Sequence, residues 1–149
     1  MKVLFADLLL QIKGIVDFDL PLISNLSNVS AIINKIGDVN WAGFYLIKDN
    51  ELILGPFQGD VACTRIKMGK GVCGTSALKR ETLIVPDVNK FEGHIACSSL
   101  SKSEIVTPII YLDKVVGVID IDAPIYNRFS NEEKEFLEEV AKIIAPLFT

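Results

Sequence analysis

The amino-acid sequence predicts an α+β domain, because its hydrophobic periodicity changes from helical to strand-like and back again. Apolar residues recur every three or four positions in residues 3–36 and again after Ser130. Between these regions, short apolar runs alternate with polar residues and are separated by turn-forming Gly, Pro, Asn and Asp. We therefore expect helices from both termini to pack on a central, mostly antiparallel sheet.

The first two helices are expected over residues 3–16 and 21–36. Pro21 suits the first helical position, because its ring fixes φ and its missing N–H is not needed there. Gly37 marks the end of the second helix, since glycine commonly follows a helix C-terminus. The apolar face of this helix comprises Leu22, Leu26, Val29, Ile32, Ile33 and Ile36.

A first pair of strands follows. The stretch VNWAGFYLI alternates, which places Trp41 and Tyr45 on the same face of a strand. The turn KDNE then leads into a second strand, LILGPF, which Pro56 and Gly59 are expected to end.

The remaining elements are predicted from similar signals. A glycine-rich loop enters a short helix near residues 72–80, and TLIVPD forms a short strand. The stretches EIVTPIIYL and KVVGVIDID form a second hairpin. Ser130 and Glu133 have the spacing of a capping box, which predicts the start of the last helix. The loop between the two hairpins is the expected place for functional residues.

Length and composition limit the classes of protein. A chain of 149 residues suits one domain, and a hydrophobic content of 50% argues against disorder. The net charge of -4 argues against a nucleic acid or an anionic membrane as partner. No apolar run is long enough to span a bilayer, and Asp7 interrupts the apolar start that a signal peptide would need. A cytoplasmic protein is expected.

Three cysteines lie in the middle third of the chain, at Cys63, Cys73 and Cys97. Together with His94 they form a possible zinc set, but structural zinc sites usually pair ligands two to four residues apart, and Cys63 and Cys73 are farther apart. We therefore expect no metal site. Small buried side chains are a second interpretation, which suits Cys73 best. Cys97 lies in the polar stretch ACSSLSKSE, where a reachable and reactive thiol is a third.

A second candidate constellation is acidic. Asp120 and Asp122 are two residues apart on a predicted strand and therefore share a face. A hairpin would bring Glu104 near them. Clustered carboxyls repel one another, so one of them can retain a proton and act as an acid, or the group can bind a substrate ammonium. A solvated strand end remains the plain alternative.

Trp41 and Tyr45 form a third candidate set, because aromatic rings on one strand face make an apolar wall with a polar edge. Such a wall suits a methyl or thioether group. An aromatic pair in an ordinary core is the alternative, and the sequence favours neither.

Four stretches together closely resemble the free methionine-(R)-sulfoxide reductases, small enzymes built on a GAF domain. They are NWAGFYL, LGPFQGDVACTRIKMGKGVCG, VPDVNKFEGHIACSSLSKSEIVTPI and GVIDIDAP. The resemblance covers nearly the whole chain, most strongly residues 40–130, and implies a single GAF domain over residues 1–149. One departure is Ser98, which stands where an aspartate is common after the cysteine.

The resemblance also implies roles for the candidate residues. Cys97 matches the catalytic cysteine, Cys63 the main resolving cysteine, and Cys73 a third cysteine that can join the exchange. The matches to the family's active-site carboxylates and pocket aromatics are Glu104, Asp120, Asp122, Trp41 and Tyr45.

The activity implied is reduction of free L-methionine (R)-S-oxide through a sulfenic acid and a disulfide that thioredoxin reduces. No cofactor is expected, and a homodimer would suit the family. A non-catalytic GAF module that binds a small ligand is the alternative, because a fold does not fix a function.

Overall fold

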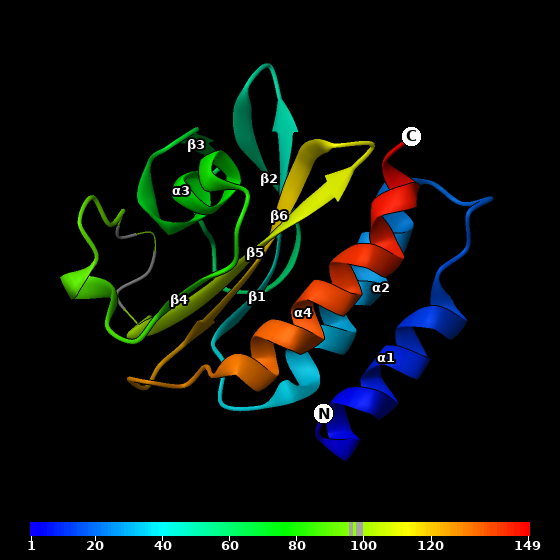
Figure 1. The fold of residues 1–149 in the computed structure, drawn as a ribbon, viewed down its shortest axis with the longest axis horizontal. Helices are drawn as coiled ribbons and strands as arrows, with labels where there is room; N and C mark the ends of the chain where they lie inside the picture. Colours follow the sequence, from blue (N-terminus) through cyan, green and yellow to red (C-terminus); the bar gives the residue numbers. More distant parts are fainter. Residues whose placement is uncertain (96, 98–99) are drawn as a thin grey trace.

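The computed structural model describes residues 1–95, 97 and 100–149, and it confirms the α+β fold (Figure 1). The helices are α1 (Val3–Ile15), α2 (Leu22–Ile33), α3 (Gly71–Lys79) and α4 (Asn131–Ile144), with short 3-10 turns η1 (Asn34–Ile36), η2 (Val88–Lys90) and η3 (Ala145–Phe148). The strands are β1 (Trp41–Lys48), β2 (Glu51–Gly59), β3 (Arg65–Lys67), β4 (Leu83–Val85), β5 (Ser103–Tyr111) and β6 (Lys114–Ala123).

The strands form one sheet in the order β3-β2-β1-β6-β5-β4, and the described pairings of neighbours are antiparallel. The two predicted hairpins, β1–β2 and β5–β6, therefore lie side by side and join through β1 and β6. Along this junction Trp41 pairs with Asp122, and Asp122 pairs in turn with Glu104 on β5. The register thus aligns three candidate residues in one row across the sheet.

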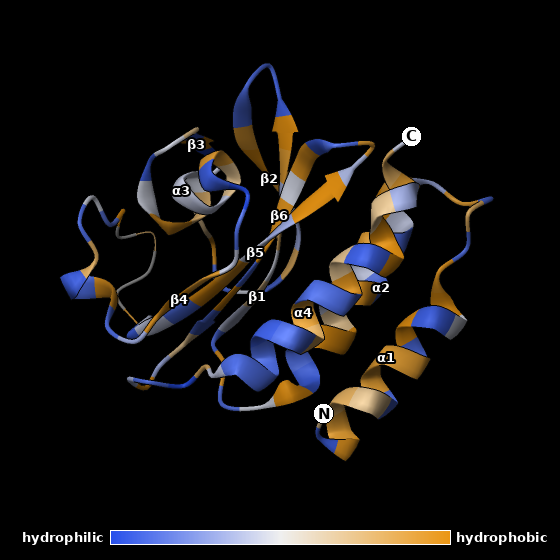
Figure 2. Cartoon of the chain, viewed as in Figure 1, coloured by the Kyte–Doolittle hydropathy of each residue, from blue (hydrophilic) through white to orange (hydrophobic). Residues whose placement is uncertain are grey.

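The two faces of the sheet are covered differently. Helices α1, α2 and α4 lie together on one face, where they bury the larger apolar cluster (Figure 1). In this cluster the rings of Phe5 and Phe136 stack at 4.9 Å, and the outward surface of α4 is hydrophilic (Figure 2). The opposite face carries α3 and a smaller cluster that includes Tyr45, Val106 and Val118.

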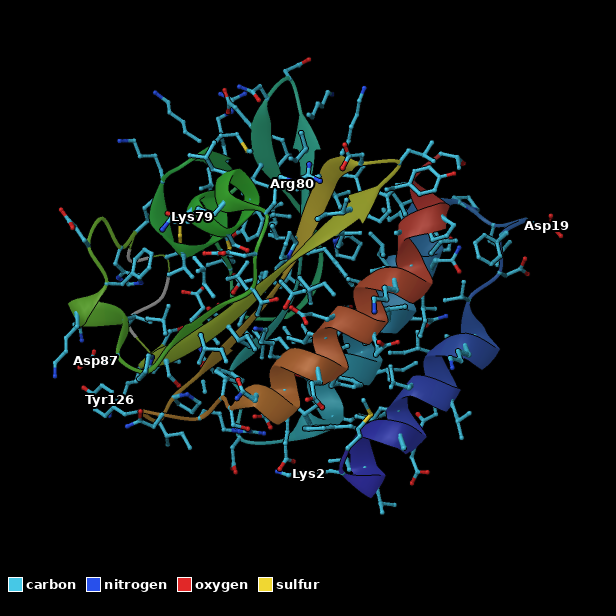
Figure 3. The ribbon with its side chains drawn as sticks, in the orientation of Figure 1. Lys2, Asp19, Lys79, Arg80, Asp87 and Tyr126 are labelled. Carbon is cyan, nitrogen blue, oxygen red and sulfur yellow. A yellow bond between two sulfur atoms is a disulfide. The ribbon has the colours of Figure 1, made fainter. Side chains whose placement is uncertain are left out.

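Charged side chains lie at the periphery of this arrangement. Lys2, Asp19, Lys79 and Asp87 project outward from four separate elements or loops (Figure 3). None of the helices in the described ranges combines the length and hydropathy that crossing a bilayer requires.

The predicted helix over residues 21–36 is divided in the structure. Pro21 is extended at ψ 150° and precedes the helix rather than beginning it, while its carbonyl accepts hydrogen bonds from the N–H groups of Ser24 and Asn25. The last turn tightens into η1, and Gly37 at φ +86° ends it as predicted.

The prediction that Pro56 ends the second strand is wrong, because β2 continues to Gly59. The register of β1 and β2 shifts between Gly43 and Tyr45, so Pro56 lies at a bulge. Proline has no N–H for the ladder, and a bulge is a place where none is needed. Strand β3, which is three residues long, was not predicted.

Candidate active site

The face of the sheet opposite the terminal helices carries the three candidate acids. Asp120 and Asp122 extend from β6, and Glu104 extends from β5 as the direct partner of Asp122, as the predicted hairpin requires. Glu104 and Asp120 are only 8% and 5% exposed. The interpretation of these acids as a solvated strand end is therefore wrong for this pair, and a buried cluster is present instead.

Burial sets the electrostatics of the cluster. Loss of solvent raises the pKa of Glu104 well above its usual range, and the charges of Asp120 and Asp122 raise it further. Loss of solvent, followed by the charge of Asp120, does the same for the pKa of Asp122. Burial also raises the pKa of Asp120, although hydrogen bonds from Glu104, Cys73 and Asp122 partly offset this effect. The cluster therefore holds protons more tightly than exposed carboxyls do.

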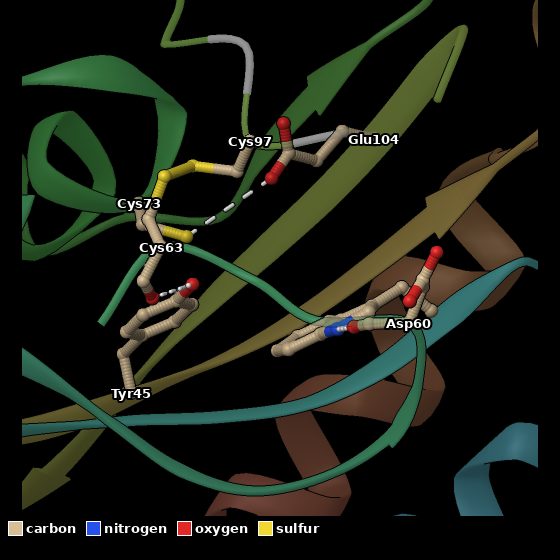
Figure 4. Close-up of a disulfide and its surroundings, with 7 residues drawn as sticks. Tyr45, Asp60, Cys63, Cys73, Cys97 and Glu104 are labelled. Carbon is tan, nitrogen blue, oxygen red and sulfur yellow. Dashed lines mark hydrogen bonds between the residues drawn. A yellow bond between two sulfur atoms is a disulfide. The ribbon is translucent and has the colours of Figure 1, made fainter. Parts of the chain in front are cut away.

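All three cysteines lie near the acids. Cys63 and Cys97 form a disulfide, with Cα atoms 5.4 Å apart, between the segment after β2 and the loop before β5 (Figure 4). Cys73 is a free, buried thiol in the first turn of α3, and its Sγ donates to Glu104 Oε2 at 4.0 Å. Burial, followed by the charges of Asp120 and Glu104, raises the pKa of Cys73, so this thiol is protonated and a weak nucleophile in the disulfide form.

The close approach of α3 to the end of β3 depends on Gly74. A Cβ at this position would lie 2.5 Å from the backbone oxygen of Lys67, so only glycine fits without a shift of the chain. The turn before α3 is also bonded to this helix, because the N–H of Gly69 donates to the Gly74 oxygen at 2.8 Å. Gly74 thereby lets α3 lie close enough to the sheet to place Cys73 beside the acids.

The zinc set considered from the sequence is not assembled. Two of its members, Cys63 and Cys97, are joined to each other. His94 lies at the edge of the same cavity, and partial burial lowers its pKa. Among the described residues, the group whose ligand atoms lie close enough to share a cation is Cys73, Glu104 and Asp120, which differs from the zinc set considered from the sequence.

The aromatic pair, Trp41 and Tyr45, is part of the buried apolar core and also lines the cavity. Trp41 and Tyr45 are 4% and 2% exposed, and their rings stack at a centroid distance of 5.9 Å. Both also line the cavity beside the acids. Their polar edges are occupied, because Trp41 Nε1 donates to the Asp60 oxygen at 3.1 Å and Tyr45 Oη donates to the Cys63 oxygen at 2.8 Å (Figure 4).

A small cavity of about 60 Å³ lies between these groups. Its lining includes two residues that sequence reasoning missed, Asn40 and Ser101, and Asn40 Nδ2 donates to Ser101 Oγ at 3.2 Å. Three buried oxygens at the cavity have no hydrogen-bond partner among the described residues: Asn40 Oδ1, Asp120 Oδ1 and Asp122 Oδ1. Nothing in the local sequence separates Asn40 from other polar residues, so the fold alone identifies it. Ala96, Ser98 and Ser99, including the predicted departure at Ser98, lie outside the described residues.

Comparisons with known proteins agree with this arrangement. The GAF domain model matches residues 21–146. The free methionine-R-sulfoxide reductase of Saccharomyces cerevisiae is 53% identical, over 95% of this chain and 83% of the relative. The Escherichia coli protein of the same name is 41% identical, over 91% of this chain and 83% of the length of that relative.

A solved structure gives the same result. Free methionine-R-sulfoxide reductase from Neisseria meningitidis, in complex with its substrate, superposes with a TM-score of 0.92 at 40% identity. The match covers 97% of this chain and 87% of the other. Since sequence and fold agree over nearly the whole length, the chain belongs to the GAF-domain family of free methionine-(R)-sulfoxide reductases.

Proposed function

We propose that the protein reduces free L-methionine (R)-S-oxide to methionine, with Cys97 as nucleophile and Cys63 as resolving cysteine. The observation that carries this proposal is the Cys63–Cys97 disulfide, which adjoins a buried acid cluster and a small cavity. The names and substrate complexes of the relatives support the same activity.

In the first step the Cys97 thiolate attacks the electrophilic sulfur of the sulfoxide. This attack forms a bond between the two sulfur atoms while an acid protonates the substrate oxygen. The hydroxyl then passes to the Cys97 sulfur as the S–O bond and the bond between the two sulfur atoms break, which releases methionine and leaves Cys97 as a sulfenic acid. The substrate sulfur gains two electrons and becomes a thioether, and Cys97 loses the same two electrons. In the second step the Cys63 sulfur attacks the Cys97 sulfur, the hydroxyl leaves as water, and the disulfide forms.

The acids divide into two roles in this proposal. Glu104 is the proton donor, because burial raises its pKa and its carboxyl lies among the sulfur atoms (Figure 4). Asp120 and Asp122 accept the substrate ammonium, and this role is supported by their Oδ1 atoms, which have no hydrogen-bond partner among the residues that the structure describes. A methionine sulfoxide inside a peptide has no ammonium, so this arrangement favours the free amino acid.

The disulfide form is the state after turnover. Its cavity of about 60 Å³ is far smaller than typical ligand pockets of about 300–1,000 Å³. Substrate therefore binds only after the disulfide is reduced, and a dithiol protein such as thioredoxin supplies the two electrons. Cys73 joins the exchange as a third thiol when the site opens. A homodimer and a cytoplasmic location stay predictions from the sequence.

The proposal is tested with thioredoxin, thioredoxin reductase and NADPH, using both sulfoxide diastereomers of methionine, each free and peptide-bound. We expect NADPH oxidation with the free (R) form alone, and none with that substrate after the Cys97→Ser substitution. Oxidation by the Cys97→Ser variant at the wild-type rate would overturn the catalytic assignment. No oxidation with any of the four substrates would favour the non-catalytic ligand-binding module instead.

A further inference from the structure

The segment that carries Cys63 is held by side chains that the chemistry of the sulfoxide does not need. This resolving segment, residues 60–64, connects β2 to β3. Tyr45 Oη donates to the backbone oxygen of Cys63, and Trp41 Nε1 donates to that of Asp60. The two aromatic residues of β1 thus hydrogen-bond to the segment at its start and near its end (Figure 4).

Both ends of the resolving segment are fixed further. The N–H of Leu54 donates to the Thr64 oxygen at 3.0 Å, which ties the far end back to β2. At the near end Gly59 has φ +135°, and a Cβ there would lie 2.7 Å from Trp41 Cδ1. Only glycine lets the chain pass this close to the indole ring.

The side chains of the resolving segment are exposed or half-buried. Asp60, Val61 and Thr64 are exposed, Val61 to 81%, while Ala62 and Cys63 are half-buried. Each backbone residue fixed in one conformation costs about 1–2 kcal/mol of entropy. Apolar contacts that offset this cost come from Ala62 and Cys63, which pack against the smaller apolar cluster. The hydrogen bonds from Trp41 to Asp60 and from Tyr45 to Cys63 add direct restraints on the backbone of the segment, apart from the disulfide itself.

These restraints do not depend on the disulfide. Both donors are fixed by burial in the sheet, and both acceptors are backbone oxygens, so neither bond needs the Cys63–Cys97 bond. Burial, followed by the charge of Asp120, raises the pKa of Tyr45, so its hydroxyl keeps its proton throughout the working range of pH. Reduction of the disulfide therefore removes neither the donor nor the acceptor of these two hydrogen bonds.

We propose that Tyr45 and Trp41 are positioning residues for the resolving step, because they hold Cys63 where its sulfur meets the Cys97 sulfenic acid. This inference rests on the proposed function and adds to it, since the aromatic residues serve the second step as well as the wall of the pocket. Holding two reacting groups in place is worth large effective concentrations, and a displacement of about 1 Å can cost about a hundredfold in rate.

The test is a single turnover of pre-reduced enzyme with free (R)-sulfoxide, in the presence of a 1,3-dicarbonyl trap for sulfenic acid. Methionine release, the trapped Cys97 adduct and the disulfide are quantified by mass spectrometry. Tyr45→Phe keeps the ring and removes the hydroxyl. We expect the ratio of disulfide to trapped adduct to fall about tenfold, the effect of losing one well-placed hydrogen bond. The double variant Cys63→Ser/Cys73→Ser, in which no other cysteine remains to form a disulfide with Cys97, sets the limit of full trapping.

Tyr111→Phe is the matched control, because Tyr111 is a half-buried tyrosine at the far end of β5, and it should leave the ratio at the wild-type value. A wild-type ratio in Tyr45→Phe overturns the inference. If Tyr45→Phe does not fold, Trp41→Phe tests the other anchor by the same ratio. Failure of the wild type to release methionine refutes the proposed function, whereas release with an unchanged ratio refutes only the positioning role.

Discussion

Glu104 is a carboxyl enclosed by a thiol and two further carboxyls, where an ionised group has little solvent to stabilise it. Burial and the charges of Asp120 and Asp122 raise its pKa, so it can still donate a proton at a pH where exposed carboxyls are ionised. A general acid works best when its pKa lies near the operating pH. The position that is unfavourable for the charge is thus favourable for the proposed chemistry.

We predict that Glu104→Gln lowers kcat by about 10²–10⁴, the usual contribution of a general acid. In the wild type kcat should fall as pH rises through the raised pKa of Glu104, because the donor is then lost. That alkaline decline should be absent from the residual activity of the variant. The measurement is kcat against pH at saturating substrate, with reduction of the disulfide kept fast.

Glu92→Gln is the control for this change, because Glu92 is exposed in the loop that leads to Cys97 and should leave the profile as it is. Full kcat in Glu104→Gln would move the acid role to Asp120 or Asp122.

At the scale of elements, the start of α4 connects the C-terminal helix to the N-terminal ones. Ser130 N donates to Glu133 Oε1 at 2.6 Å, and Ser130 Oγ accepts from the backbone N–H of Glu133, which completes the predicted capping box. Ser130 Oγ also accepts from the Glu132 N–H. Arg128 reaches from this cap to Glu133 at 3.4 Å and to the Gly37 oxygen at 2.9 Å. The cap therefore fixes α4 relative to the end of α2 and η1.

Ser130→Ala should lower the free energy of unfolding by about 1 kcal/mol, the usual cost of losing an N-cap side chain. For a chain of this size that corresponds to about 2–4 °C in Tm. Ser27→Ala is the matched control, because Ser27 is exposed within α2 and its hydroxyl only bonds back to the Ile23 oxygen. Equal Tm values for the two variants would show that the capping box contributes nothing to stability.

Local patterns predicted most elements, because caps, turns and periodicity depend on neighbours in sequence. The Ser130 cap, the two hairpins and the shared face of Asp120 and Asp122 all follow from such spacing. Strand β3 is three residues long and exists through pairing with β2, which no local pattern records. The prediction of a strand end at Pro56 is wrong because the bulge that accommodates this proline depends on the register with β1, which the local sequence does not indicate.

The site was predicted less completely than the fold. Spacing alone left the cysteines open between metal ligands, buried side chains and reactive thiols, and the disulfide partners were implied only by the family resemblance. Their meeting depends on loops that approach each other across a separation of 34 residues. Asn40 was missed for the same reason, since its place at the cavity depends on Ser101 in a distant loop.

In the whole molecule, the two faces of the sheet have separate tasks. Terminal helices and the larger apolar cluster cover one face, and the acids, thiol and aromatic rings occupy the other. Burying Glu104 and Asp120 and half-burying Asp122 costs free energy that the larger cluster must offset. The chain therefore carries a site that weakens its own fold whenever the acids are ionised, and this cost depends on pH.

The sign of that dependence follows from the direction of the pKa shifts. The pKa values of Glu104, Asp120 and Asp122 are raised on folding, so their contribution is fully present below the ordinary carboxyl pKa and is lost as pH rises through the raised values. Glu133 is opposite. Burial would raise its pKa, but hydrogen bonds from Ser130 and the charge of Arg128 lower it, so its contribution is lost as pH falls through that lowered value.

We predict that Tm of the protein declines as pH rises above the ordinary carboxyl range, because the acids of the cluster, whose pKa values are raised, then lose their protons. Glu104→Gln removes one buried ionisable group without changing its shape, so it should raise Tm at about pH 8 by a few degrees and flatten the decline, although it impairs catalysis. Differential scanning calorimetry across this range, with the disulfide intact, measures both effects. Glu92→Gln, which alters an exposed carboxyl, should keep the wild-type slope. A Tm that rises steadily toward pH 8, or a Glu104→Gln variant that is less stable there than the wild type, would show that the acid cluster stabilises the fold when ionised, and so contradict the prediction.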